Sequence, residues 1–242
     1  MRRSTFVNAI FALSAVGPLS IGVTHMDKRI AGILIPDTKL AREATDIARF
    51  AEPVEIFNHS LRTFLFAELI AKAKKTSHDT EIVYVASILH DAGLSSRYMS
   101  AKYPFEVDGA NLARTLLKEH GISDGRSDIA WDAVALHDNG GIAQHKQAEV
   151  MLVNAGVGAD FGAYLDDLAR SDIVSVLDAA PRTRFVDVFL AAAAIVAKRK
   201  PLAAAHSFVA DVGYCKVPGF HIPSFCDEVL TDPFAEYYKP NG

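Results

Sequence analysis

Cysteine is scarce in this sequence of 242 residues, which contains only Cys215 and Cys226. Two thiols near the C-terminus make neither a disulfide framework nor a zinc site built from four thiolates. We expect both to stay reduced or simply buried, because a free cysteine behaves as a small hydrophobic residue. A disulfide between them is the alternative in an oxidising compartment.

An excess of positive charge is also missing. Lysine and arginine number 25 against 29 acidic residues, which leaves a formal net charge of -4. A nucleic-acid surface normally requires a clustered excess of lysine and arginine, so we expect no nucleic-acid partner. Hydrophobic residues, by contrast, make up 50% of the chain, which is enough for a sizeable buried core. We expect a single domain.

Residues 1–25 carry the one feature that suggests targeting. Two arginines precede an apolar stretch, which resembles a signal peptide, but no clear cleavage site follows, and Met26 could begin a shorter protein. We therefore predict a signal peptide or an N-terminal extension here, and a cytoplasmic protein unless the segment directs export. Stable membrane insertion is not expected, because Asn8 and Pro18 interrupt a stretch that barely reaches spanning length.

From Pro36 onward the hydrophobic pattern is helical, and no alternation is long enough to build a sheet. Most of the expected helices stop at glycine or proline. The predicted ranges are 37–52, 60–75, 77–93, 107–120, 127–138, 144–156, 161–179 and 184–200. The sequence therefore predicts an all-α fold, a single-domain helical bundle over residues 26–242. The segment from Gly213 is expected to be an irregular tail that docks on the bundle or packs against a second copy.

Three positions among the nine histidines stand at expected helix ends, where a bundle can build a pocket. His59 precedes one helix, His90 and Asp91 end another, and His137 ends a third. Imidazole nitrogens and carboxylate oxygens suit zinc, iron or manganese. Adjacent helical side chains point about 100° apart, but His90 and Asp91 can reach one ion if the helix ends there and Gly93 lets the backbone turn.

The spacing of these residues resembles a known family. The stretch FNHSLRTFLFAELIA followed by YVASILHDAGL, with thirty residues between His59 and His90, is similar to the HD superfamily of helical metal-dependent hydrolases. The runs RYMSAKYPFEVDGANLARTLLKEHG and AVALHDNGGIAQHKQAEVMLVNAGVGADFG resemble its cyanamide hydratase branch. The resemblance covers roughly residues 30 to 210 of this chain.

The resemblance implies a metal site. Carried over residue by residue, it makes His59, His90 and Asp91 metal ligands and assigns the last ligand to Asp160. Asp172 and Asp178, on the following helix, are the alternatives for that last position.

A single divalent ion is expected. Many two-metal members of the superfamily carry a histidine before a Gly-Ala pair, and this chain has Asp108 there. Asp108, His120 or His137 would have to serve a second ion. Zinc is the first expectation for the metal, with iron, manganese and nickel as alternatives, because two histidines and two aspartates suit all four.

The resemblance also implies a reaction, the hydration of cyanamide or a related small nitrile. A bound zinc ion lowers the pKa of water to about 7, which provides hydroxide at neutral pH. We assign catalytic roles to Asp91, which would orient the nucleophile, and to His137, which would donate a proton to the nitrogen.

Other functions and other roles for these residues remain open. A phosphohydrolase would use the same ion, but the nearby cations are not clustered as phosphate pockets require. A binding module without catalysis is the third class. His137 can equally be a hydrogen-bonded helix-end histidine, and we expect a structural role for His120 at a helix end and for Arg62 in a salt bridge between helices.

Overall fold

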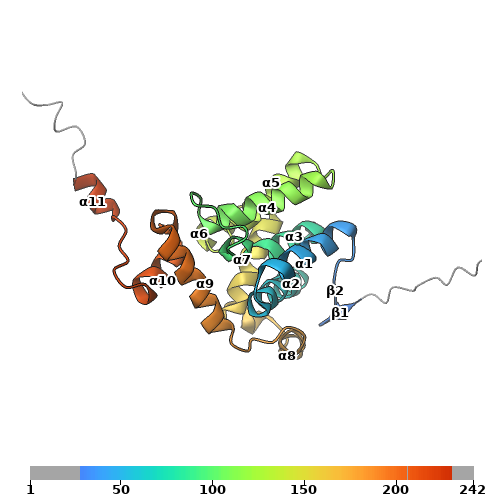
Figure 1. The fold of residues 1–242 in the computed structure, drawn as a ribbon. Helices are drawn as coiled ribbons and strands as arrows, with labels where there is room; N and C mark the ends of the chain where they lie inside the picture. Colours follow the sequence, from blue (N-terminus) through green and yellow to red (C-terminus); the bar gives the residue numbers. More distant parts are fainter. Residues whose placement is uncertain (1–27, 206, 231–242) are drawn as a thin grey trace, which may run out of the picture.

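The computed structural model describes residues 28–205 and 207–230 (Figure 1). The segment 1–25, predicted to be a signal peptide or an extension, lies outside the described residues, and so does the tail beyond residue 230. Among the described residues, no helix is both long enough and apolar enough to cross a bilayer.

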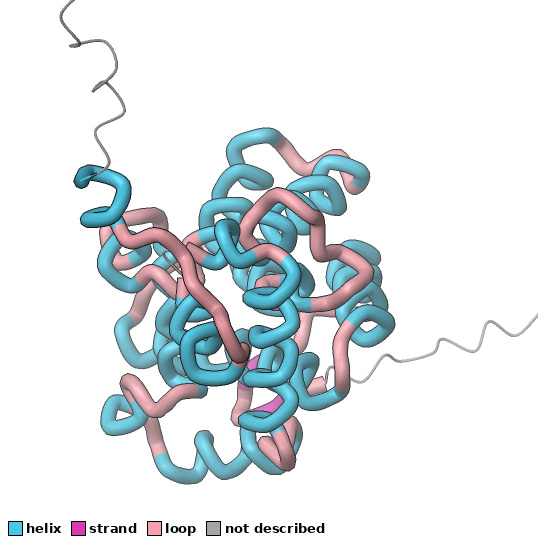
Figure 2. Tube along the Cα trace, turned by 60° about the vertical axis from the view of Figure 1, so that its left-hand side comes forward, coloured by secondary structure: helices cyan, strands magenta, loops and turns pink. Residues whose placement is uncertain are grey.

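Helices make up almost all of the regular structure (Figure 2). They are α1 (Lys39–Ala51), α2 (Val54–Lys74), α3 (Thr80–Leu89), α4 (Phe105–Glu119), α5 (Asp124–Ala135), α6 (Gly140–Ala143), α7 (Ala148–Asp160), α8 (Arg170–Ala179), α9 (Phe185–Arg199), α10 (Phe208–Lys216) and α11 (Phe225–Leu230). Two short antiparallel strands, β1 (Arg29–Ile30) and β2 (Ile33–Leu34), precede them. The prediction of an all-α fold is confirmed.

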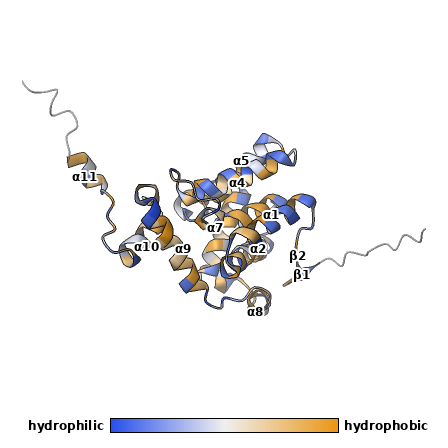
Figure 3. Cartoon of the chain, viewed as in Figure 1, coloured by the Kyte–Doolittle hydropathy of each residue, from blue (hydrophilic) through white to orange (hydrophobic). Residues whose placement is uncertain are grey.

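Helix α2 lies in the middle of the bundle, packed along α7 and beside α3. Its large apolar side chains, among them Phe64, Leu65 and Ile70, are buried, and α3 is buried along almost its whole length. Figure 3 shows that much of α1 and α7 is hydrophobic as well. One continuous core therefore runs through α1 to α5 and α7.

A second, smaller apolar cluster lies beside this core. It joins Phe185 and Phe189 of α9 to Val209 of α10 and to Phe105 at the start of α4. Because Gly93, two residues after Asp91, lies against the backbone of Phe105, the cluster borders the end of α3 where His90 and Asp91 stand.

Helix α2 begins earlier than predicted. Pro53 occupies its N-cap position, and α2 starts at Val54 instead of Ser60 because proline has the backbone angle of a helix start and lacks the N–H that would be unsatisfied there. His59 therefore lies in the second turn of α2 instead of before its start, and its side chain is buried.

The segment 161–169 is not the predicted helix. Gly162 and Tyr164 have φ values of 101° and 58°, in the left-handed region that interrupts a right-handed helix, and α8 begins only at Arg170. The turn brings Tyr164 beside α7, at the cavity described below.

Part of the chain after Gly213 is helical where an irregular tail was expected. Helix α10 continues to Lys216, and α11 covers Phe225–Leu230. The side chain of Ser207 caps α10, and the ring of Phe220 packs directly over Gly213, so the chain folds back onto the helix.

Gly93 and Gly156 are required by close packing. The sequence suggested that Gly93 lets the backbone turn, and in the structure it has no positive φ. It lies against the backbone of Phe105, where a Cβ atom would overlap the carbonyl oxygen. Gly156 of α7 lies in the same way against the carbonyl oxygen of Thr63 in α2, so α2 and α7 pack closely beside His59.

We expect Gly156→Ala to lower the free energy of unfolding by about 1–3 kcal/mol, because the new methyl group must push α7 away from α2. The measurement is chemical denaturation of both proteins. Gly125→Ala is the matched control, since no atom of the described residues lies within 4 Å of its Cβ position, and it should stabilise α5 by about 0.5–1 kcal/mol. Equal effects of the two substitutions would contradict the packing argument.

Candidate metal centre

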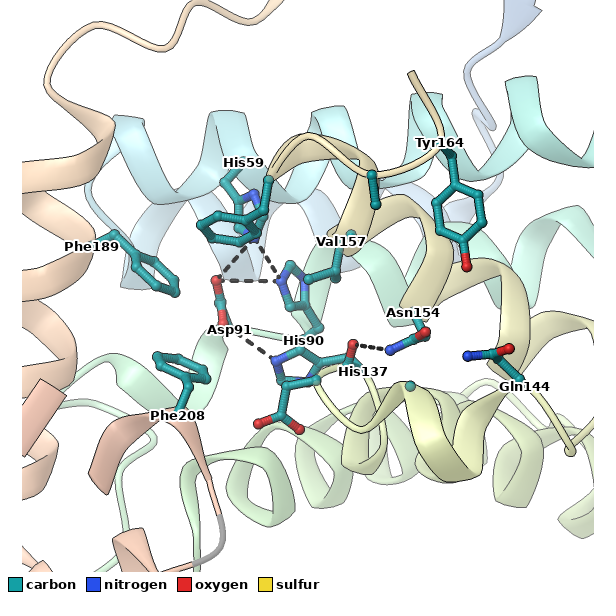
Figure 4. A pocket seen from close by; sticks show the side chains of 15 residues that line it. His59, His90, Asp91, His137, Gln144, Asn154, Val157, Tyr164, Phe189 and Phe208 are labelled. Atoms are coloured by element: carbon teal, nitrogen blue, oxygen red, sulfur yellow. Dashed lines mark hydrogen bonds and ion pairs between the residues drawn. The ribbon is translucent and has the colours of Figure 1, made fainter. Parts of the chain in front are cut away.

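Four ionisable side chains meet at the centre of the bundle (Figure 4). His59 comes from the second turn of α2, His90 and Asp91 from the end of α3, and His137 from the end of α5. Each is at most 2% exposed. Charged or polar groups this deeply buried are costly unless they are paired, hydrogen-bonded or bound to a metal.

Each of the three imidazoles is held through its Nδ1 atom, which can donate only if it carries the ring proton. The acceptors are Asp160 for His59 at 2.7 Å, the carbonyl oxygen of Ser87 for His90 at 2.8 Å, and that of Val134 for His137 at 2.7 Å. With the proton on Nδ1, each Nε2 atom presents a lone pair. This is the tautomer in which histidine binds a metal through Nε2.

These lone pairs point toward one another and toward Asp91. The Nε2 atoms of His59 and His90 are 3.2 Å apart, and they lie 3.7 Å and 3.3 Å from Asp91 Oδ2. Two ligands of a tetrahedral zinc ion, each about 2.0 Å from it, are themselves about 3.3 Å apart. The spacing therefore fits a cation between them, whereas facing lone pairs without a cation would repel.

Asp91 gives the second sign that the site suits a metal. Both of its oxygens are buried, and neither has a hydrogen-bond partner among the described residues. His137 Nε2 lies 3.9 Å from Oδ1, on the other side of the carboxylate from His59 and His90. The donor set fits a divalent ion: His59, His90 and Asp91 present ligand atoms that all lie within 4.8 Å of one another, and His137 lies beside this group.

The electrostatics of the cluster favour neutral imidazoles at His59 and His137 and an ionised carboxylate at Asp91. Burial lowers the pKa of His59 and His137, so both are neutral at neutral pH. Burial alone would raise the pKa of Asp91, but the neighbouring His90 and then His59 outweigh it and hold the pKa below its ordinary value. Burial likewise opposes protonation of His90, yet Asp91 raises its pKa overall. The negative charge of Asp91 thus stabilises positive charge in the cluster.

Asp160 lies behind His59, beyond the facing Nε2 atoms. Its two oxygens accept hydrogen bonds at 2.7 Å and 2.8 Å from the guanidinium of Arg62, and Oδ2 also accepts from His59 Nδ1. Arg182 pairs with the same carboxylate. As the side chains lie, Asp160 is placed to orient His59, and its predicted role as the fourth metal ligand stays a prediction. Asp172 and Asp178 of α8 do not join the cluster either.

Arg62 has the structural role that the sequence suggested. It is fully buried, and besides Asp160 it donates to the carbonyl oxygens of Ala180 and Pro181. It therefore ties α2 to the end of α7 and to the turn after α8. Burial opposes the charge of Asp160, but His59 and Arg62 hold the pKa of the carboxyl below its ordinary value.

Two candidates for a second ion have other partners. Asp108 accepts a hydrogen bond of 2.6 Å from the buried ammonium of Lys200 and another from the backbone N–H of Ser100. His120 lies at the end of α4 and pairs with Glu43 at 2.8 Å. Neither belongs to the cluster around Asp91, which agrees with the expectation of one ion.

Two buried glutamates near the cluster had no sequence signal. Glu52 follows α1, and neither of its oxygens has a hydrogen-bond partner among the described residues. Burial, and secondarily the charge of Asp91, raises its pKa well above the ordinary value. Glu106, in the first turn of α4, has its pKa raised by burial to about 7. The sequence places both beside helix ends, where exposed acids are common.

Glu106 should make the protein less stable as the pH rises. Because its pKa is higher folded than unfolded, the proton that Glu106 retains stabilises the fold below pH 4.5, and this contribution is lost as the pH passes 7. Between pH 5 and 7 the loss is about 2 kcal/mol relative to Glu106→Gln. Parallel denaturation curves of the two proteins at both pH values provide the measurement. A pH-independent difference would contradict the assigned shift.

A cavity of about 470 Å³ opens from the cluster. His59, His90, Asp91 and His137 form one part of its wall, and no lysine or arginine of the described chain lines it. The rest of the wall combines apolar side chains with Asp138 and a few neutral polar residues (Figure 4). The arrangement can therefore present a metal ion to a small uncharged molecule.

Comparison with known proteins gives a consistent result. The profile of the HD domain matches residues 56–180, about half of the chain, and this range contains all four residues of the cluster. Two proteins of Saccharomyces cerevisiae, the cyanamide hydratases DDI2 and DDI3, are each 25% identical to this chain over 187 residues. The matched region covers 75% of this chain and 83% of each yeast protein.

Proposed function

The chain belongs to the HD domain family of metal-dependent hydrolases, and from this premise we propose that it adds water to a small nitrile, with cyanamide as the substrate to test and urea as the product. One observation carries the proposal: three imidazole lone pairs and a carboxylate without hydrogen-bond partners among the described residues converge at the wall of a cavity that no described lysine or arginine lines. The similarity to the two yeast cyanamide hydratases supports the choice of substrate.

His59, His90 and Asp91 would hold one divalent ion, with zinc as the first choice and iron, manganese or nickel as alternatives. Asp160 is the candidate for the fourth protein ligand, and His137 is assigned to proton transfer. A bound ion of this kind supplies Lewis acidity, which lowers the pKa of water to about 7 and polarises a nitrile.

The reaction adds one water to the carbon–nitrogen triple bond. The oxygen of water bonds to the nitrile carbon, one π bond of the nitrile breaks, and one proton of water moves to the nitrogen. Loss of the second proton from oxygen to that nitrogen gives urea. Asp91 orients the attacking water, and His137 Nε2, which presents a lone pair 3.9 Å from Asp91, takes a proton from water and returns it to nitrogen.

The charges around the cavity argue against a phosphohydrolase. Phosphate pockets usually combine several cationic donors, and the wall as described has none. The nearest arginines, Arg62 and Arg182, are already paired with Asp160. Lys146 pairs with Asp132 instead. A nucleotide or phosphoester would therefore lack the contacts that its charge requires.

The test is elemental analysis of the purified protein combined with a urea assay. We expect about one metal ion per chain and urea formation from cyanamide that stops when a chelator removes the metal. Hydrolysis of phosphoesters without urea formation would overturn the proposal and identify a phosphohydrolase instead. A protein that binds no metal after reconstitution would favour the binding module.

A further inference from the structure

The cavity is much larger than cyanamide requires. Cyanamide has three heavy atoms and occupies the space of about two water molecules, roughly 60 Å³. The cavity measures about 470 Å³, which falls in the range that holds drug-sized ligands. Cyanamide alone would leave most of this space to water.

The wall next to the metal cluster is aromatic. Phe189 and Phe208 are stacked with ring centres 5.3 Å apart, and Phe161 lies 5.7 Å from Phe189. Figure 4 shows Phe189 and Phe208 together near Asp91, on the side of the cavity away from Tyr164. Aromatic side chains in such arrangements bind flat or bulky apolar groups, because rings attract one another edge-to-face or offset. Val157 of α7 extends the same surface.

The opposite side of the cavity carries neutral polar groups. Gln144, Asn154 and Tyr164 lie together there (Figure 4), and Asn154 is fixed by donating to the carbonyl oxygen of His137 at 2.8 Å. Amides and hydroxyls can hydrogen-bond to a ligand without neutralising a charge. With no lysine or arginine in the described part of the wall, and with Asp138 in it, an anionic ligand would be left without a counter-charge.

The backbone of Tyr164 is strained. Tyr164 is a non-glycine residue with φ of 58°, a conformation that costs about 1–2 kcal/mol. The ammonium of Lys74 lies 4.9 Å from the centre of its ring and supports it from α2. Strained residues of this kind are concentrated at functional sites, and this one forms part of the cavity wall.

We propose that this site takes an uncharged nitrile that carries an apolar group about the size of a benzyl group. The nitrile lies at His59, His90 and Asp91, and the apolar group lies along Phe161 and Val157, with its far edge at Tyr164. The inference rests on the proposed function for the reaction and adds the substrate class.

Three compounds that share the reactive group test this proposal. They are cyanamide, benzylcyanamide and (4-carboxybenzyl)cyanamide, and each takes up one water to give the corresponding urea. We expect kcat/KM of the metal-loaded protein to be at least tenfold higher for benzylcyanamide than for cyanamide, because the aromatic wall is then covered. The kcat/KM for the carboxylated compound should be at least tenfold lower than that for benzylcyanamide. Equal or lower kcat/KM for benzylcyanamide than for cyanamide would overturn the proposal.

Ligand binding separates this inference from the reaction itself. Calorimetry with the product benzylurea should show at least tenfold tighter binding than with urea. Turnover of none of the three compounds would overturn the proposed function, whereas the preference for benzylurea would still support the cavity assignment. Cyanamide turnover without any preference for benzylurea would overturn the assignment and leave the proposed function standing.

Tyr164→Gly tests the wall directly. Glycine adopts a positive φ without strain, so the variant should keep or raise the melting temperature while it weakens benzylurea binding at least fivefold. A tyrosine that served only packing would show the reverse, a lower melting temperature with unchanged binding. Tyr103→Gly is the matched control, because Lys102 also lies over the Tyr103 ring, at 5.3 Å, but Tyr103 does not line the cavity.

Discussion

Asp91→Asn is expected to abolish metal binding and to lower kcat/KM for cyanamide by about a thousandfold, which corresponds to about 4 kcal/mol of transition-state stabilisation. Asparagine has nearly the same size as aspartate, so the cavity should keep its shape. It has no negative charge, however, and cannot offset the charge of a divalent ion. The measurements are metal content after dialysis and the rate of urea formation.

The stability of the metal-free protein distinguishes this explanation from simple misfolding. His90 and His59 hold the pKa of Asp91 below its ordinary value, so its ionised form contributes to the stability of the metal-free fold. The metal-free Asp91→Asn protein should therefore still unfold cooperatively, at a lower temperature than the metal-free wild type. Addition of zinc should stabilise the wild type only.

Asp172→Asn is the control for Asp91→Asn. Asp172 is an acid on α8 outside the cluster, and the sequence offered it as an alternative ligand. The Asp172→Asn protein should keep both metal and turnover. If Asp91→Asn also retained one metal and normal turnover, Asp91 would not be a metal ligand, and the proposed function would be overturned.

The local part of the centre is visible in the sequence, because His90 and Asp91 are neighbours and thirty residues separate His59 from His90. The resemblance to the HD superfamily turned this spacing into three ligands, and the structure brings the same three together. His137 was weighed equally as a pocket group and as a hydrogen-bonded helix-end histidine, and it is both, since it lies in the cavity wall and its Nδ1 atom donates to the carbonyl oxygen of Val134.

The parts that depend on long-range packing could not be predicted. Phe189 and Phe208 come from α9 and α10, and nothing in their local pattern distinguishes a cavity wall from a core position. The strained turn at Tyr164 was taken for helix because a single glycine, Gly162, is tolerated within a helical pattern and the hydrophobic spacing continues past it. Asp160 was expected to bind the metal, and it lies at the Nδ1 atom of His59, because spacing along a chain cannot tell which ring nitrogen a carboxylate faces.

Arg62→Met is expected to lower the free energy of unfolding by about 3–5 kcal/mol, because it leaves the buried carboxylate of Asp160 without its bidentate partner. The carbonyl oxygens of Ala180 and Pro181 lose their donor as well. Chemical denaturation gives the measurement. Arg42→Met is the matched control, because Arg42 and Asp37 form an exposed ion pair. This substitution should lower the free energy of unfolding by less than about 1 kcal/mol.

The pH dependence gives the same prediction a second test. The pKa of Asp160 is held below its ordinary value, against burial, by His59 and Arg62, so its ionised form stabilises the fold above about pH 4, and this stability is lost as the pH falls through the folded pKa. Without Arg62 the folded pKa rises. The acid-induced loss of stability should therefore be smaller in Arg62→Met than in the wild type. An equal loss in both proteins would contradict the pairing.

The double variant Arg62→Met, Asp160→Leu separates folding from metal binding. Replacing both partners by apolar residues removes the buried charge, so most of the lost stability should return. Metal affinity should stay about 10–100-fold below that of the wild type, because His59 Nδ1 has lost the acceptor that orients its ring. A metal affinity of the double variant equal to that of the wild type would mean that Asp160 neither orients His59 nor binds the ion. Failure to recover stability would instead place the main role of Arg62 at the carbonyl oxygens after α8.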